Sequence, residues 1–318
     1  MPVLNEERHL ESAVQHVLAQ AYPGEIQVVL AVGPSKDRTQ EVADALAAAD
    51  PRVRAVPNPT GRTPSALNAA LQAASGPIIA RVDGHAMLPD DYLRVAVETL
   101  ESTGAENVGG IMAAEGVTAF EQAVARAMTS RFGVGNAAFH TGGQAGPADT
   151  VYLGVFRREA LDRVGGYDED YTRAQDWEMN HRIRSSGGLI WFEPRMRVSY
   201  RPRPNLKALA RQYFDYGRWR RVVARQHKGT INLRYLAPPG AVVAIVAGAV
   251  VGAAGLRPAF VIPGAYVVGV AGAALATGKG LSPVAKAWLP LVYATMHLPW
   301  GLGFLTSPAS LVPHRGDG

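Results

Sequence analysis

Over the first hundred residues, short apolar runs alternate with segments whose apolar positions have helical spacing. Ile26–Val32 is an uninterrupted run rich in β-branched residues, which is typical of a strand buried on both faces of a parallel sheet. Two further strands are predicted over Val53–Pro57 and Pro77–Val82. Helices are predicted around them, over Glu7–Gln20, Thr39–Ala49, Pro64–Ala74 and Pro89–Ser102. This order predicts an α/β fold with a doubly wound, mostly parallel sheet, which binds ligands at the carboxyl ends of its strands.

The first strand of this pattern is short. Met1–Leu4 leads directly into the polar turn Asn5-Glu6-Glu7, where a longer strand is expected. Two interpretations remain open: the strand is truncated, or its true start lies upstream. The first residues carry acids and no apolar stretch, so no secretory signal peptide is expected.

The C-terminal part of the chain is apolar without a polar face. Leu236 to Thr277 is a run of 42 residues that carries one charge, Arg257. Arg257 divides it into Leu236–Leu256 and Ala259–Thr277, each about the 20 residues that a membrane-spanning helix needs. A third apolar run, Ala287 to Val312, contains three prolines and is expected to be a kinked span or a re-entrant segment. A buried hairpin of a soluble core is the alternative, but such helices normally show a polar face.

Charge divides the chain in the same places. Residues 1–200 hold 18 Lys and Arg against 25 Asp and Glu, whereas residues 201–234 hold ten basic residues and one acid. Positive charge before the first span favours a cytoplasmic domain on a cell (inner) membrane. We therefore expect a cytoplasmic domain over 1–200, a basic interfacial helical segment over 201–235, membrane spans over 236–312 and a tail over 313–318.

Composition excludes several functions. The chain has 318 residues and no cysteine, which rules out disulfides, a thiol nucleophile and a Cys-ligated metal. The sequence pI of about 9.5 comes from the basic segment next to the apolar tail, and the first 200 residues are acidic. Nucleic acid is therefore not an expected partner.

Candidate chemistry begins where the strand Pro77–Val82 ends. Asp83-Gly84-His85 places a carboxylate and an imidazole two residues apart at the carboxyl end of a strand. Such a pair can hold Mg²⁺ or Mn²⁺ against a diphosphate, and the imidazole suits Mn²⁺ better. A solvent-exposed Asp-Gly turn is the alternative interpretation.

A second candidate carboxylate lies almost a hundred residues later. Asp176 is expected near the start of a helix over 173–184, where the helix end favours its ionised form. Glu178 and Arg182 are spaced to form an ion pair at the surface of that helix. Asp176 is therefore the better candidate for a general base, with a plain helix cap as the alternative.

Two further segments have two interpretations each. Arg211–Arg221 interleaves basic and aromatic residues, which indicates either an amphipathic helix on anionic lipid or a phosphate-binding arginine cluster on an aromatic platform. Phe139–Gly143 is either a mobile acceptor loop or a plain surface loop.

The ordered combination of these motifs resembles a known family. The sequence contains, in order, Pro2-x-x-Asn5-Glu6, Ser35-x-Asp37-x-Thr39, Asp83-x-His85, Gln175-Asp176-Trp177 and Arg218-Trp219. This order resembles glycosyltransferase family 2, nucleotide-diphospho-sugar transferases with the A-type fold, over residues 1 to about 235. The C-terminal spans, with His297-x-Pro-Trp300, and the Asp-Gly-His-Ala form are most similar to its succinoglycan-biosynthesis subgroup of exopolysaccharide glucosyltransferases.

The resemblance implies a role for each matching residue. Pro2, Asn5, Glu6 and the loop with Asp37 would border the nucleoside, and Arg62 and Asn68 would lie near the uridine and phosphates. Asp83 and His85 would face a metal–diphosphate, with Mg²⁺ or Mn²⁺ as cofactor. Asp176 would be the general base, and Arg218 and Trp219 would lie near the diphosphate and the acceptor. Three positions depart from the family pattern: Val32-Gly33, Gln175 and Asp215.

The function expected from these features is inverting, metal-dependent transfer of a hexose from a nucleotide-diphospho-sugar. By resemblance alone, the donor is UDP-glucose and the acceptor a lipid-linked glycan in cell-surface or exopolysaccharide synthesis. Two alternatives remain, a processive polysaccharide synthase and an inactive membrane-anchored assembly partner. Product length tests the first alternative, and donor hydrolysis by the purified protein tests the second.

Overall fold

The computed structural model describes residues 1–311, so Val312 and the predicted tail over 313–318 lie outside the described residues. The chain forms two compact units. The first comprises Met1–Ala113 and Gly142–Tyr200, and the second comprises Ala114–Thr141 and Arg201–Gly318. The sequence-based division assigned residues 114–141 to the first 200, whereas the structure groups them with the C-terminal helices. The reason is that α5 (Ala119–Met128) packs against α13 (Pro283–Leu305).

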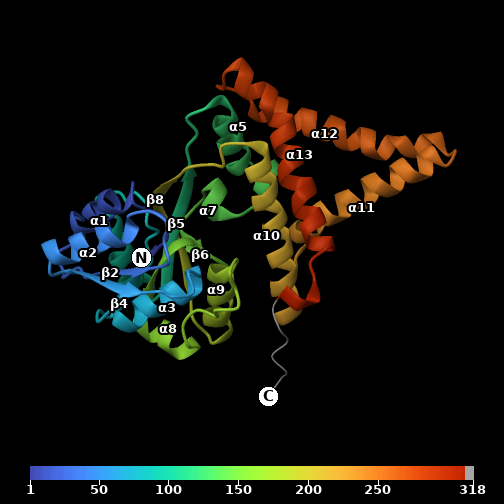
Figure 1. Ribbon diagram of the computed structural model, residues 1–318. Helices are drawn as coiled ribbons and strands as arrows, with labels where there is room; N and C mark the ends of the chain where they lie inside the picture. The colour runs from blue at the N-terminus through green and yellow to red at the C-terminus, as the bar shows by residue number, and fades with distance from the viewer. Residues whose placement is uncertain (312–318) are drawn as a thin grey trace. The chain divides into compact units, whose positions relative to one another are not determined.

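The first unit begins with a three-stranded parallel sheet (Figure 1). Its strands are β1 (Pro2–Val3), β2 (Val28–Val32) and β3 (Val53–Pro57), in that order. β1 has only two residues, but these pair in parallel with the last two of β2, so the turn after β1 still lies at the carboxyl edge of the sheet. The parallel pairing places the ends of β2 and β3 at the same edge.

Both faces of β2 are buried, as its uninterrupted apolar pattern predicts. Val28, Leu30 and Val32 point into the large core of the first unit, which includes α1 (Leu10–Leu18) and part of α2 (Thr39–Ala49). The alternate residues, Val29 and Ala31, pack on the other side against α3 (Thr63–Ala73). Helices therefore cover both faces of the sheet, which is the doubly wound arrangement.

A second sheet completes the first unit with the strand order β4-β7-β5-β8-β6. The pairs β4–β7, β5–β7 and β6–β8 are antiparallel, so parallel pairing is found in the first sheet and the whole is a mixed α/β fold. The fold class expected from the sequence is confirmed. The bounds of the remaining elements are β4 (Ile78–Ala80), β5 (Asn107–Ala114), β6 (Gly146–Pro147), β7 (Tyr152–Arg157), β8 (Ile190–Tyr200), α4 (Tyr92–Thr103), α8 (Arg158–Val164) and α9 (Gln175–Ser185).

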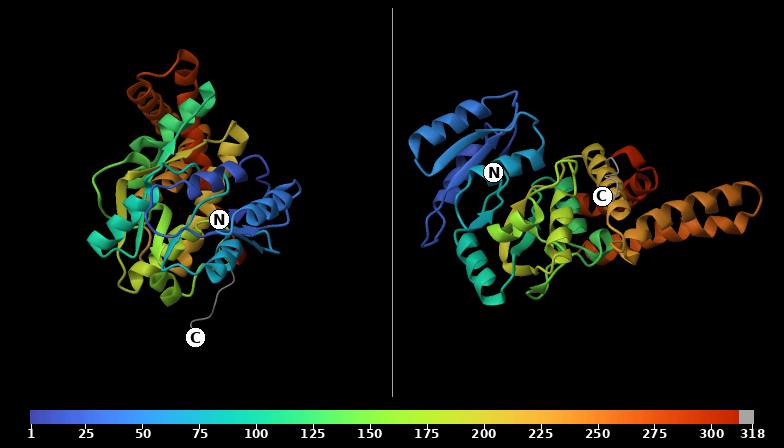
Figure 2. Two further views of the ribbon diagram at one scale, coloured as in Figure 1. Left: turned by 90° about the vertical axis from the view of Figure 1, so that its left-hand side faces the viewer. Right: turned by 90° about the horizontal axis from the view of Figure 1, so that it is seen from below.

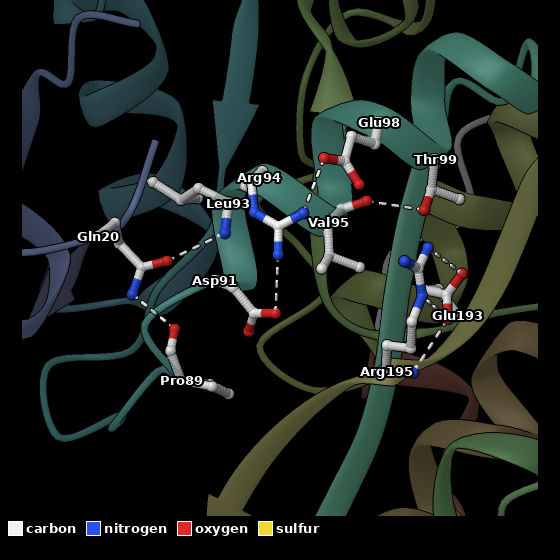
Figure 3. A network of polar contacts seen from close by, with 10 residues as sticks. All are labelled: Gln20, Pro89, Asp91, Leu93, Arg94, Val95, Glu98, Thr99, Glu193 and Arg195. Atoms are coloured by element: carbon white, nitrogen blue, oxygen red, sulfur yellow. Dashed lines mark hydrogen bonds and ion pairs between the residues drawn. The ribbon is translucent and has the colours of Figure 1, made fainter. Parts of the chain in front are cut away.

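Hydrogen bonds and ion pairs hold the start of α4 in place (Figure 3). Gln20 accepts a hydrogen bond from the backbone N–H of Leu93 at 3.0 Å and donates one to the carbonyl of Pro89 at 2.7 Å. Arg94 pairs with one acid in the preceding turn and one in the following turn. The start of α4 is therefore held in place directly after the loop that carries Asp83.

In the second unit, α10 (Leu206–Gln226) crosses α13 at two glycines. A Cβ atom on Gly217 would collide with the carbonyl oxygen of Trp300, and one on Gly303 would collide with that of Phe214. The backbones approach too closely for any side chain at these positions. The unit also contains α6 (Arg131–Val134), α7 (Ala138–Thr141) and the 3-10 helix η2 (Ala309–Leu311).

Two helices of the second unit are long and apolar enough to cross a membrane. They are α11 (Leu233–Ala253) and the stretch Arg257–Thr277, which joins the short 3-10 helix η1 (Arg257–Phe260) to α12 (Val261–Thr277). The two helices lie side by side as a hairpin (Figure 2). Only 17% of each window is buried, and at 21 residues each is about 30 Å long, the thickness of a hydrocarbon core. Their positions agree closely with the first two predicted spans.

The third apolar run differs from its prediction. It forms one continuous helix, α13, which contains Pro290 and Pro299 and ends at Leu305. Within residues 1–311, it is not among the helices that qualify as candidate spans. Leu289 and Tyr293 are fully buried in the second unit, so packing against α5 and α10 compensates for the helical hydrogen bonds that the prolines lack.

Candidate functional site

The two carboxylates singled out in the sequence share one arginine. Asp83 follows β4, and Asp176 is the second residue of α9. Between them lies the guanidinium of Arg81, whose side chain is only 9% exposed. Its Nη2 and Nε lie 3.1 and 3.3 Å from Asp83 Oδ1, and its Nη1 donates a hydrogen bond to Asp176 Oδ1. Arg81 therefore holds together the carboxylates of Asp83 and Asp176, which are far apart in the sequence.

The start of α9 places Asp176 at this point. Ala174 precedes the helix with φ of 59°, a left-handed conformation that costs a non-glycine residue about 1–2 kcal/mol. Glu178, in the same turn, forms the predicted ion pair with Arg182 at 2.7 Å, but Glu178 is buried, so the pair does not lie at the surface as predicted. Arg182 also donates to the carbonyl of Gly166, so the helix is fixed to the preceding turn. Glu178 is thus structural, and Asp176 is left facing Arg81.

Opposing effects set the ionisation of this group. Burial raises the pKa of Asp176 above its ordinary value; the Arg81 guanidinium lowers it, and the negative charge of Asp83 raises it again. For Arg81, burial alone would lower the pKa, but the carboxylates of Asp176 and Asp83 outweigh it and hold it well above its usual value. Arg81 is therefore a permanent cation. The Asp176 side chain is 37% exposed, so a reacting group can reach its carboxylate.

His85 contacts the loop after β1. Its Nδ1 lies 2.8 Å from Glu6 Oε1. The intervening residue, Gly84, allows this approach, because a Cβ there would lie 3.1 Å from the Cγ of Glu6. The backbone N–H of Glu6 in turn donates a hydrogen bond to the Thr39 hydroxyl oxygen at 2.7 Å. The loop after β4 is thereby joined to the loops after β1 and β2.

The loops expected to border a nucleoside are joined to each other. Asn5 has φ of 56°, and its side-chain oxygen accepts the backbone N–H of Lys36 at 2.8 Å. Asp37 accepts hydrogen bonds from the Thr39 hydroxyl and from the backbone N–H of Glu7, and the hydroxyl is the main cause that lowers the pKa of Asp37. Pro2 pairs with β2 inside the sheet. These residues lie together at the carboxyl edge, with most polar atoms of Asn5 and Asp37 used to hold the loops.

Asn68, on α3, makes hydrogen bonds to the turn that precedes α9. Its side chain donates to the carbonyl of Tyr167 and to Glu169 Oε1, and it accepts the backbone N–H of Tyr167 at 2.8 Å. Ser65 also donates to Glu169, at 2.6 Å. Asn68 therefore clamps the turn that leads to α9. Arg62 immediately precedes α3, and its charge acts on Glu169.

Arg218 and Trp219 belong to α10 in the second unit. Trp219 is buried there. The Nη1 of Arg218 lies 4.0 Å from Asp215 Oδ1, and its guanidinium lies 5.7 Å from the ring centroid of Phe214. In this environment Arg218 has both a carboxylate and an aromatic partner within its own helix.

The residues at this site fit a metal ion that is bound mainly by the phosphates of a substrate. Within residues 1–311, no three His, Asp or Glu side chains form a ready-made metal site. Asp83 is 25% exposed and supplies one carboxylate, and the His85 side chain is 59% exposed. Mg²⁺ takes one or two protein carboxylates and fills its remaining positions with water and substrate phosphates. A donor set this small matches that mode of binding.

The chain belongs to glycosyl transferase family 2, which its residues 1–165 match. It is a glycosyltransferase. Among curated proteins, it is 33% identical over 313 residues to the succinoglycan biosynthesis protein ExoA of Rhizobium meliloti (strain 1021). This similarity covers 96% of the chain and 92% of that protein. The family expected from the ordered motifs is confirmed.

Solved structures share the fold. The mannosyltransferase PcManGT from Pyrobaculum calidifontis, in complex with GDP-Man and Mn²⁺, superimposes with a TM-score of 0.60 at 20% identity, over 96% of this chain and 85% of that one. S. aureus TarS 1–349 in complex with UDP gives 0.50 at 13% identity, over 93% and 88%. At these identities the likeness shows the architecture alone.

Arg81 is the residue that the sequence analysis missed. It lies directly after β4, within the run Pro77–Val82 that was interpreted as a strand. A charged residue inside such a run is rarely buried unless it is paired. This was the available signal, because it indicates acidic partners nearby in the fold.

Proposed function

We propose that this glycosyltransferase transfers a hexose, with inversion, from a nucleotide-diphospho-sugar to a lipid-linked glycan acceptor at the cell (inner) membrane. UDP-glucose is the proposed donor. Exopolysaccharide synthesis is the proposed process, because the name of the succinoglycan relative indicates that process for that protein. The observation that carries the proposal is the shared contact of Asp83 and Asp176 with Arg81. It brings a carboxylate suited to the donor and a carboxylate suited to the acceptor to one partly exposed place.

Asp176 is the proposed general base. An inverting transfer needs one group to take the proton of the acceptor hydroxyl as its oxygen attacks the anomeric carbon. Asp176 is reachable from solvent, and it lies in the first turn of a helix whose N–H groups favour its ionised form. Its raised pKa also makes it a stronger base than an ordinary aspartate. General-base help of this kind contributes about 10²–10⁴-fold to rate.

Arg81 is proposed to hold the Asp176 carboxylate in position and to favour its ionised form. Its guanidinium pairs with Asp176 before the reaction and stays cationic throughout. When Asp176 accepts the proton, Arg81 retains Asp83 as a partner, so its buried charge is never left alone. The same charge favours loss of the proton from Asp176 after transfer.

Asp83, with His85 beside it, is the proposed holder of Mg²⁺ or Mn²⁺. When bound, the ion would neutralise the negative charge that develops on the leaving nucleoside diphosphate. Asn5, Glu6 and Asp37 border the proposed nucleoside side, where their mutual hydrogen bonds hold the two loops in a fixed shape. A preformed pocket of this kind loses little conformational entropy on binding.

The two candidate spans support the choice of a lipid-linked acceptor. A glycan carried on a membrane lipid stays at the bilayer surface, so an enzyme anchored by α11 and α12 meets it by diffusion in two dimensions. The basic residues of 201–234 precede the first span, which favours a cytoplasmic position for the first unit. Accessibility of engineered cysteines in this cysteine-free chain would test the orientation.

A screen of nucleotide sugars tests the proposed function. The detergent-solubilised full chain is incubated with UDP- and GDP-sugars, with and without Mg²⁺ or Mn²⁺, and nucleoside diphosphate release is measured. We expect release from UDP-glucose in the presence of metal, and faster release when a polyprenyl-diphosphate glycan is added. Full activity in excess chelator would refute the metal role, and preference for another donor would refute the choice of sugar. No release from any donor would favour the inactive assembly partner.

A further inference from the structure

We propose that a cluster around Tyr235, in the second unit, binds the phosphate group of a membrane lipid. The Tyr235 cluster consists of Arg220, Arg234, Tyr235, Trp300 and His140. It contains none of the residues assigned to the donor, and it deepens the proposed function, on which its link to a lipid-linked acceptor rests.

Two guanidinium groups converge on one aromatic ring. The Arg220 guanidinium carbon lies 3.9 Å from the centroid of Tyr235, and that of Arg234 lies 4.6 Å from the same centroid. Arg234 also donates a hydrogen bond to the Tyr235 hydroxyl. Each contact is favourable by itself, but bringing two cations to one ring costs Coulomb energy. An anion bound at this place would remove that cost.

Arg234 retains hydrogen-bonding capacity. Its Nε is buried and has no hydrogen-bond partner within residues 1–311, and no carboxylate in that range lies within ion-pair distance of its side chain. Acids are scarce in this part of the sequence, because residues 201–311 contain only Asp215. That carboxylate lies beside Arg218 instead. A buried guanidinium N–H without an acceptor is costly, and a phosphate oxygen is the acceptor it suits best.

His140 adds a donor without adding charge. Burial, together with the charge of Arg234, lowers the pKa of His140 to about 4, so the imidazole is neutral at pH 7. Its Nδ1 is buried and lacks a partner in the described part of the chain. A neutral imidazole can donate one hydrogen bond to an anion beside a guanidinium. His140, which lies in the segment for which the sequence left two interpretations open, thus contributes to this cluster.

The surroundings indicate a lipid rather than a soluble phosphate. Arg234 and Tyr235 lie in the first turn of α11, a candidate span, so the cluster lies at the level where a bilayer has its phosphates. The neighbouring Leu233 and Leu236 are 85% and 44% exposed, which provides apolar surface beside the cations. Trp300 stacks on Tyr235 with ring centroids 6.4 Å apart, and paired aromatics are typical of the membrane interface.

Lipid binding to the full chain tests the proposal. The protein is reconstituted in phosphatidylcholine nanodiscs that contain either phosphatidylglycerol or a polyprenyl diphosphate, and retained lipid is counted by native mass spectrometry. Arg234→Gln is compared with Arg257→Gln, which removes the same charge at the other end of α11. We expect Arg234→Gln to weaken binding about tenfold, the equivalent of one lost charged hydrogen bond, and Arg257→Gln to change it less than twofold.

Each result has a defined meaning. Arg234-dependent retention of the diphosphate alone supports an acceptor site, and retention of both lipids supports a general anionic-lipid site. Equal effects of the two substitutions, or no effect of either, would overturn the proposal. If Arg234→Gln lowers the melting temperature, the binding assay is repeated with Arg234→Lys in its place. Lipid binding by Arg234→Lys at the wild-type level would also overturn the proposed site. Donor hydrolysis by the wild type is measured in parallel, because its absence would refute the proposed function and leave an Arg234-dependent lipid site standing.

Discussion

Replacing Arg81 by glutamine should move the acid limb of the pH–rate profile to higher pH. The proposed base, Asp176, works only when ionised, so the lower limb of kcat/KM reports its pKa in the free enzyme. The charge and the hydrogen bond of Arg81 lower this pKa, whereas burial and the charge of Asp83 raise it. Without the guanidinium, Asp176 should become harder to ionise, and activity at low pH should fall.

The size of the shift follows from the contact. An arginine in direct contact lowers an aspartate pKa by about 1–3 units. The Asp176 side chain is 37% exposed, so solvent screening reduces the effect. On the acid side of the limb we therefore expect the activity of Arg81→Gln to be about tenfold below that of the wild type, because fewer Asp176 carboxylates are ionised. Arg81→Lys retains the charge but cannot bridge both carboxylates, and should shift the limb by a smaller amount.

The assay is the initial rate of donor turnover between pH 5 and 9 at saturating metal. Arg158→Gln is the matched control, because Arg158 is a half-buried arginine whose hydrogen bonds within residues 1–311 go to the backbone carbonyls of Gly76, Leu71 and Ala74. It should lower the melting temperature without moving the limb. An unchanged limb in Arg81→Gln, or an equal shift in Arg158→Gln, would refute the assignment of Arg81.

Three further substitutions test other parts of the structure. Asp83→Ala should abolish metal-dependent turnover, measured by titrating Mn²⁺ into the donor assay, and a normal metal response would exclude Asp83 as the ligand. Gly217→Ala should destabilise the second unit by about 1–3 kcal/mol or more, because the added methyl meets the carbonyl of Trp300; thermal unfolding in detergent measures this, and an unchanged midpoint would contradict the close crossing. Thr118→Ala should cost about 1 kcal/mol in the same assay, since it removes the capping box with Glu121 at the start of α5.

Local pattern predicted the parallel half of the fold well. Val28–Val32 and Val53–Pro57 are strands, and Thr39–Ala49 is a helix, as the runs and spacings indicated. In these elements the hydrophobic period and the tertiary burial agree, so no long-range information is needed. The fold class and the family were confirmed for the same reason: ordered motifs at strand ends reflect a fixed topology.

Contacts between elements that are far apart in the sequence could not be predicted from local patterns. The helix at Ala119–Met128 packs against α13, about 160 residues later in the sequence. The apolar spacing of this helix does not identify the element that it packs against. Pro290 and Pro299 were interpreted as breaks, although tertiary contacts keep α13 continuous. Arg81 escaped notice because a strand pattern does not show which acids a buried cation will meet. The hydrogen bonds by which Asn68 holds the turn at Tyr167 could not be predicted either, because that turn lies about a hundred residues away in the sequence.

The central claim is that Asp176 removes the proton of the acceptor. The most direct measurement is the transfer rate of Asp176→Asn, taken together with the affinity of the same variant for the UDP-sugar. Asparagine keeps the shape of the side chain and removes the basic oxygen, so transfer should fall by about 10²–10⁴-fold while donor affinity stays within a few fold of the wild type. Transfer at close to the wild-type rate by a variant that binds the donor normally would contradict the account.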